Sequence, residues 1–587
     1  MHRVRLRKLF PFVSLIVILT TIMGCAGPTG PGAAAPGQPA APAAVPGSEL
    51  PVPRNETIYL EDTGTFRIFD SYNTYIPNGN DFANGYIQVG KEYLFYANFA
   101  TGEIQPWLAK DYVYNKDFTE LTIHLRDDVK WNDGQPWTSD DIIFTVNMLL
   151  KNQALGGGAT MQEFVKSVAA PDKTTVVFTL TKPAPRFHYT FFGQVDAFTP
   201  VPKHIWDGKD PMTFKNDPPV STSVWKLKQT LPDLKMFVWE RDENYWGKAN
   251  QFPKAKYIVY RTAPPVDADY QDLVNNVIDH AHRIQWEQVK QAEAANPMVV
   301  HGPFQDPCPR GLWVNAGKYP LSKPELRWAI SDLVNRDKIA KVIWQPPTVP
   351  ADHPWSDWKL LQKYLDKDVL AKYKIEYAPD KAAKILDDLG FKAGADGIRV
   401  DDKGNKLSFT MITPAEVGVG EFQIATDVSE EAKKVGIEIT VKAVTGPVFD
   451  NATATGDFDL TSHWLCGNGF MDPIGLYSPY QSKNAAKIGE RDTAGNWIRL
   501  QDKDLDAAVE KLETISPDAP EAPAAYAAAL EAWMKAMPAI PVVQTIYVMP
   551  WNQTYWKNWP VENNMYTVPF TWWGLFYPVT FKVEPAK

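Results

Sequence analysis

The sequence predicts an α/β fold, because strand-like runs alternate with helical patterns along the chain and capping residues separate the two. Residues 121–125 (LTIHL) and 174–180 (TTVVFTL) alternate in polarity as strands do. Between them, Thr138 precedes a helical pattern and is expected to cap it. The apolar face of that predicted helix consists of Ile142, Ile143, Val146, Leu149 and Leu150. No internal repeat is evident.

Helix signals continue in the second half of the chain. Residues 321–344 predict one amphipathic helix, whose apolar residues are Trp328, Ala329, Leu333 and Ile339. Asp380 is expected to cap another helix, which stops at Gly390. Pro523 suits the first turn of an Ala-rich helix that Pro538 ends.

The composition excludes some classes of protein and leaves others open. With 587 residues, 44% hydrophobic and 22% charged, the chain is typical of a globular protein with several domains. Lys and Arg number 60 against 69 Asp and Glu, so the chain has no overall basic field for nucleic acid. The 21 Trp and 24 Tyr suit stacking on rings or flat ligands, although they also suit a core.

The first residues are typical of a sorting signal. Four cations, Arg3, Arg5, Arg7 and Lys8, precede an uncharged apolar run over 9–23. That run has about 15 residues, whereas a membrane-spanning helix needs about 20, so it fits a signal peptide. Residues 22–25 (IMGC) resemble a bacterial lipobox, in which Cys25 becomes lipid-modified and then the mature N-terminus. The alternative is an ordinary secretory signal in which Cys25 is incidental.

Residues 26–52 consist almost entirely of Ala, Pro and Gly, with Glu49 as their only charge. This composition cannot bury a core and predicts a disordered tether. A lipid on Cys25 would therefore anchor a folded body just outside the membrane.

Catalytic and metal-binding signatures are absent from the sequence. There is no G-x-S-x-G elbow, no phosphate loop and no H-E-x-x-H. His280 and His282 form a lone H-x-H, which is more typical of core or solvated histidines than of a metal site. Residues 400–405 (VDDKGN) predict a hairpin turn; they lack the distal Glu of a calcium loop. No enzymatic activity, cofactor or metal is predicted, with a secreted glycoside-processing enzyme left as an alternative of another class. A disulfide between Cys308 and Cys466 is also left open.

Four ordered stretches resemble the extracellular solute-binding protein family 5 of bacterial ABC importers, which includes oligopeptide-, dipeptide-, nickel- and oligosaccharide-binding proteins. They are residues 94–109, 121–144 (LTIHLRDDVKWNDGQPWTSDDIIF), 324–339 (PELRWAISDLVNRDKI) and 458–473. In such motifs Trp107, Trp131 and Trp137 are expected in the core. Arg327 and Arg336 are expected to pair with acids near one helix.

The resemblance implies a two-lobed, hinged periplasmic-binding-protein fold with an extra subdomain in the first lobe. The implied divisions are a signal peptide over 1–25, a tether over 26–52, lobe I over 53–307 with a subdomain at about 91–219, lobe II over 308–545, and a return to lobe I over 546–587. The crossovers are expected at 307–309 and 541–545. Such a protein closes on a ligand, is recognised by a membrane permease and works without nucleic acid, here as a monomer outside the cytoplasm.

The family's peptide binders hold an amino group with an Asp in the loop after residues like 458–464. Here Gly467 stands at that position, and the neighbouring Asn468 suits hydroxyl groups. Aromatic side chains that are expected near the cleft suit pyranose rings. The predicted ligand is therefore a neutral oligosaccharide of cello, xylo or manno type, with a peptide as the alternative and nickel or another small solute remaining open. The candidate ligand-binding residues are Asn84, Trp286, Trp464, Asn468, Trp572 and Trp573, with Tyr566 and Tyr577 near them.

Overall fold

The computed structural model describes residues 50–587, except 63–68, 77–78, 80–83, 194–197, 263–265, 416–418, 466–470 and 572. Cys25, Cys466, Asn468 and Trp572 therefore lie outside the described residues, as do the signal peptide and nearly all of the tether. Within the described residues, every helix is too short or too polar to cross a bilayer. Cys308 is disulfide-bonded.

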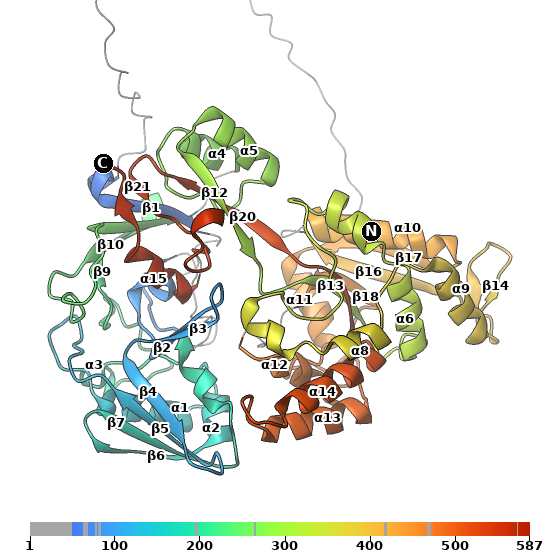
Figure 1. The fold of residues 1–587 in the computed structure, drawn as a ribbon, viewed down its shortest axis with the longest axis horizontal. Helices are drawn as coiled ribbons and strands as arrows, with labels where there is room; N and C mark the ends of the chain where they lie inside the picture. Colours follow the sequence, from blue (N-terminus) through green and yellow to red (C-terminus); the bar gives the residue numbers. More distant parts are fainter. Residues whose placement is uncertain are drawn as a thin grey trace, which may run out of the picture. The chain divides into compact units, whose positions relative to one another are not determined.

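The first lobe is built on a mixed sheet with the strand order β1-β11-β10-β9 (Figure 1). Its strands are β1 (Thr57–Asp62), β11 (Tyr257–Thr262), β10 (Met236–Arg241) and β9 (Trp225–Leu231). β1 runs parallel to β11, whereas β10 is antiparallel to both of its neighbours. Helices α4 (Val266–Val274) and α5 (Trp286–Ala295) cover one face, where Leu273 and Val289 pack with Tyr59, Val238 and Val259.

A subdomain is inserted between β1 and β9. It holds an antiparallel sheet in the order β4-β5-β7-β6, with strands β4 (Ala109–Tyr114), β5 (Glu120–Leu125), β7 (Thr175–Leu180) and β6 (Val165–Asp172). A smaller sheet contains β2 (Phe95–Asn98), β3 (Glu103–Pro106) and β8 (Phe192–Gly193), and the helices are α1 (Ser139–Lys151), α2 (Gly158–Phe164) and α3 (Lys203–Trp206). The strands predicted at 121–125 and 174–180 are confirmed. Thr138 caps α1, accepting from the Asp140 N–H.

The second lobe has a five-stranded sheet in the order β17-β16-β18-β13-β19. Its strands are β13 (Arg310–Val314), β16 (Ser408–Pro414), β17 (Glu438–Val444), β18 (Leu460–Trp464) and β19 (Ala539–Val543), with a hairpin of β14 (Lys392–Ala393) and β15 (Arg399–Val400) beside it. Its helices are α6 (Pro324–Asp332), α7 (Arg336–Lys338), α8 (Lys367–Lys372), α9 (Pro379–Asp388), α10 (Val419–Lys434), α11 (Gly446–Thr455), α12 (Ile474–Tyr477), α13 (Lys503–Thr514) and α14 (Ala522–Ala536). β16 is parallel to both β17 and β18, so the carboxyl ends of these three strands share one edge.

Two long strands connect the lobes. β12 (Val299–Gln305) pairs antiparallel with β20 (Ile546–Asn552) along its whole length. Short segments, 306–309 and 544–545, lead from this pair directly into β13 and β19 of the second lobe (Figure 1). The chain thus crosses between lobes twice, at adjacent points, which is the arrangement of a hinge.

The C-terminal tail packs on the first lobe. It contains β21 (Trp556–Lys557), α15 (Tyr577–Thr580) and β22 (Glu584–Pro585). The indole N–H of Trp556 donates to the Thr57 carbonyl at 2.6 Å, beside the start of β1. The Tyr577 hydroxyl donates to the Glu92 carboxylate at 2.8 Å.

The single helix predicted within 321–344 is wrong, because the chain breaks after α6. Leu333 ends α6, and Asn335 starts the next helix by accepting the Lys338 N–H on its side chain.

The expected cap at Asp380 is also wrong. Pro379 occupies the first helical position of α9, so the helix starts earlier and Asp380 lies within its first turn. The hairpin turn after β15 is confirmed, since Asp401 accepts the N–H groups of Lys403 and Asn405.

The expectation that Arg327 and Arg336 pair with acids is wrong, because both guanidinium groups donate to backbone carbonyls. Arg327 donates from Nε to Ala536 at 3.0 Å and from Nη1 to Leu321 at 2.8 Å. Arg336 donates to Pro541 at 2.8 Å and to Ser331 at 3.0 Å. Burial lowers the pKa of Arg327 to about 10 and that of Arg336 to about 9. Their role is to satisfy carbonyls at the end of α14 and along β19.

Candidate functional site

The strongest candidate site lies at the carboxyl edge of the second-lobe sheet. Ligands of open α/β sheets bind outside the carboxyl ends of parallel strands. β16, β17 and β18 end at this edge, and the residues 416–418 and 466–470, outside the described part, follow β16 and β18. Trp464 is the last residue of β18 and stands opposite Arg310 in the strand register. The edge therefore presents an indole ring beside a guanidinium group.

The guanidinium group of Arg310 is buried at this edge and is bound by neighbouring side chains. Its side chain is 1% exposed, its Nε lies 2.5 Å from Glu421 Oε1, and its Nη1 lies 3.3 Å from Asp306 Oδ2. Burial opposes the charge of Arg310, but Tyr547, Glu421 and Asp306 outweigh it and raise the pKa of the guanidinium. Its positive charge is balanced by these two carboxylates and is not free for a ligand.

Aromatic rings surround the same guanidinium. Its carbon lies 5.1 Å from the Trp344 ring centroid, 5.3 Å from that of Trp464 and 5.8 Å from that of Tyr547. Trp464 is half-buried and stacks on His463 at 4.4 Å with an interplanar angle of 29°. Burial and the nearby Arg310 charge lower the pKa of His463 to about 3, so the imidazole is neutral at physiological pH. The Trp464 indole therefore stacks on a neutral imidazole.

The tail places a second tryptophan near the hinge. Trp573 is half-buried, and its ring packs edge-to-face on Phe570 at 4.8 Å. Phe570 in turn contacts Phe304 of β12 at 4.6 Å. Tyr566 stands in the same tail segment, and its carbonyl accepts a 2.8 Å bond from Asn98 of the subdomain. Tyr577 lies in the core of the first lobe with no exposed surface.

The structure places Asn84 and Trp286 within the first lobe. Asn84 is buried, and its side-chain oxygen accepts the Tyr86 N–H at 2.8 Å while its carbonyl accepts the Trp239 indole N–H at 2.8 Å. Trp286 begins α5 and packs edge-on against His301 of β12 at 5.3 Å. Neither residue is brought into contact with Trp464 by any described interaction. The predicted residues are therefore spread over both lobes, and their roles stay predictions.

Sequence reasoning missed Arg310, Glu421, Trp344 and Tyr547 as members of this edge. A short signal for Arg310 does exist, since it opens a strand directly after the predicted crossover at 307–309. Nothing local to Trp344 or Tyr547 links them to Arg310, because they lie 34 and 237 positions after it in the chain. Trp107, Trp131 and Trp137 are buried, as predicted.

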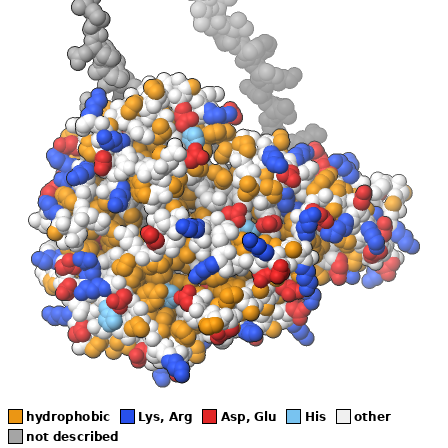
Figure 2. Space-filling model, in the orientation of Figure 1, with side chains coloured by type: hydrophobic (Ala, Val, Ile, Leu, Met, Phe, Trp, Pro, Cys, Tyr) orange, Lys and Arg blue, Asp and Glu red, His pale blue; other side chains and the backbone are white. Residues whose placement is uncertain are grey.

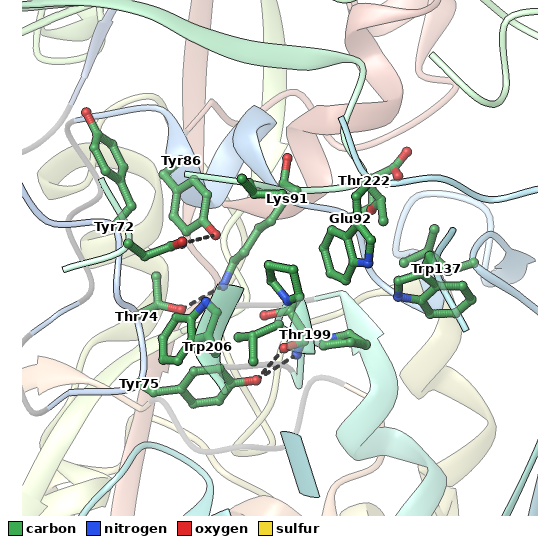
Figure 3. A pocket seen from close by; sticks show the side chains of 18 residues that line it. Tyr72, Thr74, Tyr75, Tyr86, Lys91, Glu92, Trp137, Thr199, Trp206 and Thr222 are labelled. Atoms are coloured by element: carbon green, nitrogen blue, oxygen red, sulfur yellow. Dashed lines mark hydrogen bonds between the residues drawn. The ribbon is translucent and has the colours of Figure 1, made fainter. Parts of the chain in front are cut away.

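Two hollows lie away from this edge. One, of about 20 Å³, lies within the segment that connects β1 to β9 (Figure 3). Several of its polar groups bind one another: Tyr75 donates to the Thr199 carbonyl at 2.5 Å, and the Lys91 ammonium lies 3.5 Å from the Thr74 hydroxyl. The other, of about 370 Å³, lies near Ser408 at the amino end of β16, the opposite end of that strand.

The histidines and the surface charges bear on other kinds of site in the described part of the chain. It contains no group of three or more His, Cys, Asp or Glu that could hold a metal ion. His280 is buried and His282 is half-buried, and desolvation lowers their pKa values to about 4 and about 3. On the face drawn in Figure 2, basic and acidic side chains are interspersed.

Comparisons with known proteins agree with this architecture. The family model for bacterial extracellular solute-binding proteins, family 5 Middle, matches residues 103–487. A probable ABC transporter-binding protein of Deinococcus radiodurans is 27% identical over 482 residues, which cover 73% of this chain and 78% of the relative.

Two solved structures from Thermotoga maritima share the fold. A periplasmic oligopeptide-binding protein of an oligopeptide ABC transporter superposes with a TM-score of 0.80 at 24% identity, covering 91% of this chain and 99% of that one. A mannohexaose-bound form gives a TM-score of 0.73 at 22% identity over the same shares of the two chains. The two hinged lobes agree with the fold of these structures, and the match of the family model over 103–487 shows that this chain belongs to the bacterial extracellular solute-binding proteins of family 5.

Proposed function

We propose that this protein captures a neutral oligosaccharide of cello, xylo or manno type between its lobes and delivers it to the permease of an ABC importer. Its role as an importer's solute-binding protein follows from its family; the class of ligand is the proposal. One observation carries it: the half-buried indole of Trp464 stands at the sheet edge against an arginine whose charge is already balanced.

This arrangement favours an uncharged ligand for a physical reason. An ionised ligand group needs a countercharge when it leaves water, and an unpaired one is costly to bury. At this edge Glu421 and Asp306 pair with Arg310. Asp472, which follows the segment after β18 in the sequence, pairs with Arg186. An indole face, by contrast, contributes burial and C–H contacts to a pyranose ring without any charge. The mannohexaose bound to the similar Thermotoga protein supports the same ligand class.

The alternative is a peptide ligand, which is supported by the oligopeptide-binding description of the Thermotoga relatives. A thermal-shift screen separates the two. Mannohexaose, cellohexaose and xylohexaose are compared with a mixed peptide library at equal concentration. We expect at least one sugar to raise the melting temperature. A rise with peptides alone would replace the oligosaccharide proposal with the peptide one.

Variants of the full chain then locate the binding site. Titration calorimetry with the sugar that gives the largest shift should show binding weakened about tenfold or more in Trp464→Ala and in Trp573→Ala. Trp328→Ala is the matched control, since Trp328 is also half-buried but lies on α6 and donates its indole N–H to the Met534 carbonyl. Equal affinities in all three variants would remove Trp464 and Trp573 from the site.

The remaining features of the proposed function rest on sequence and family. We propose that Cys25 carries a lipid that anchors the protein to the outer face of a membrane. The body acts as a monomer, performs no turnover of its ligand and uses the lobe boundaries 53–307 and 308–545, with 546–587 returning to lobe I. Asn84, Trp286, Asn468 and Trp572 remain candidate contacts for the same variant series.

A further inference from the structure

Arg186 reaches from the subdomain of the first lobe into the second lobe. Its Nε lies 2.6 Å from Asp472 Oδ2, and its Nη2 donates to the Tyr526 hydroxyl at 2.9 Å. Its Nη1 donates to the carbonyls of Leu512 at 2.9 Å and Ile515 at 2.8 Å. One guanidinium group thus joins a carboxylate, a phenol and the carboxyl end of α13, all in the other lobe.

This contact is withdrawn from water, unlike an ordinary surface ion pair. The Arg186 side chain is 11% exposed and that of Asp472 is 1% exposed. The carboxyl end of a helix carries partial negative charge, so the carbonyls of α13 add to the attraction of the carboxylate. A planar guanidinium meets several acceptors in fixed directions, which makes the contact specific for one arrangement of the lobes.

The acceptors keep partners of their own when Arg186 leaves. Asp472 also accepts the hydroxyl of Tyr526 and, at 2.9 Å, the N–H of Ile474, both from its own lobe. Water can bind the exposed carbonyls of Leu512 and Ile515. Lobe separation therefore leaves no buried charge without a partner, and the contact can form and break reversibly.

We propose that Arg186, Asp472 and Tyr526 form a latch that closes the first lobe on the second without help from the ligand. The latch lies close in sequence to the candidate site, because Asp472 follows the segment 466–470 that continues from Trp464. A second contact between lobes accompanies it: Phe99 of the subdomain stacks on Trp358 at 4.2 Å with an interplanar angle of 16°.

The latch changes ligand affinity by changing the population of closed protein. When only a fraction of the protein is in the binding-competent form, the apparent affinity falls by that fraction. Arg186 acts here as a positioning residue, so its loss weakens every ligand by one common factor, whatever the ligand class. The inference rests on the two-lobed fold and not on the proposed oligosaccharide.

Single-molecule fluorescence on the ligand-free full chain tests the latch. One dye is attached at Lys166 of β6 and the other at Lys384 of α9, both exposed residues in different lobes. We expect wild type to populate a closed state, and Arg186→Gln to lower the closed-to-open ratio about tenfold or more. Arg186→Lys should give an intermediate ratio. Arg126→Gln is the matched control, since Arg126 pairs with Asp128 of its own lobe at 2.6 Å.

A wild-type protein that is wholly open without ligand would overturn the latch, and so would equal ratios in wild type and Arg186→Gln. If Arg186→Gln does not fold, Tyr526→Phe decides, because it removes one hydroxyl and should lower the ratio by a smaller factor. Addition of mannohexaose is a separate arm. Its failure to bind would count against the oligosaccharide and leave the latch intact.

Discussion

The hydroxyl of Tyr577 donates a 2.8 Å hydrogen bond to Glu92, although 485 positions separate the two residues. The same carboxylate accepts the indole N–H groups of Trp107 at 2.8 Å and Trp246 at 3.1 Å, and the hydroxyl of Tyr245 at 2.7 Å. Burial raises the pKa of Glu92, and these donors partly offset that effect. One buried carboxylate thus ties the tail to the first lobe.

Removing the tail's hydroxyl should destabilise the first lobe. Tyr577→Phe leaves a buried carboxylate with one donor fewer, so we expect a loss of about 1–3 kcal/mol in the free energy of unfolding. Urea unfolding followed by tryptophan fluorescence measures it. Tyr319→Phe is the matched control, because that side chain is 59% exposed and its change should stay within about 0.5 kcal/mol. Equal losses in the two variants would contradict this role for Glu92.

Because Arg327 donates to backbone carbonyls, the stability of the fold should depend on its guanidinium group and not on nearby acids. Arg327→Lys cannot reach Ala536 and Leu321 together, so it should cost about 1–3 kcal/mol of stability. Glu325→Gln, an exposed change on the same helix, should cost less than about 0.5 kcal/mol. Chemical denaturation of both variants measures this. A larger loss of stability in Glu325→Gln than in Arg327→Lys would favour the interpretation that Arg327 pairs with an acid.

Stability should fall as the solution becomes acidic, because buried histidines are neutral in the fold. Burial lowers the pKa of His280 to about 4, whereas an unfolded chain titrates near about 6.5. The unfolded state therefore binds the proton first, and stability present above about pH 6.5 is lost as the pH falls towards about 4. His280 alone should contribute about 2 kcal/mol of this loss between about pH 7.5 and pH 5.

The variant His280→Gln isolates that contribution. Its amide can still donate to the Pro550 carbonyl, which accepts from His280 Nδ1 at 2.8 Å. The slope of unfolding free energy against pH should become shallower between about pH 6.5 and pH 5. His124→Gln serves as the comparison, since the side chain of His124 is 44% exposed. An unchanged slope in His280→Gln would show that this histidine is not the titrating group.

The lipobox-like residues 22–25 predict a lipid anchor. Cells that express the full chain should incorporate labelled palmitate into wild type and not into Cys25→Ser, because the thiol is the acceptor of the lipid. Cys308→Ser is the comparison, because Cys308 is disulfide-bonded in the folded body, and this variant should keep the label. Equal labelling of wild type and Cys25→Ser would contradict the lipid anchor and favour the interpretation of residues 1–25 as an ordinary secretory signal.

Local sequence signals predicted those parts of the fold that depend on neighbouring residues. Thr138 caps α1 because its side chain reaches an N–H two positions on. The alternation in 121–125 and 174–180 reports which face of each strand is buried. The same reasoning failed at Leu333, where the apolar pattern continues but the Asn335 side chain starts a new helix.

The sequence by itself determined the α/β class, the cap at Thr138, the strands at 121–125 and 174–180, and the family resemblance, since each rests on residues close together in the chain. Only the tertiary structure decided that Arg327 serves carbonyls, that Arg310 is already balanced beside Trp464, and that Arg186 meets Asp472 286 positions away. The physical reason is that a guanidinium group is satisfied by whichever carboxylate or carbonyl the fold brings within about 3 Å, and the residues flanking an arginine carry no record of that partner.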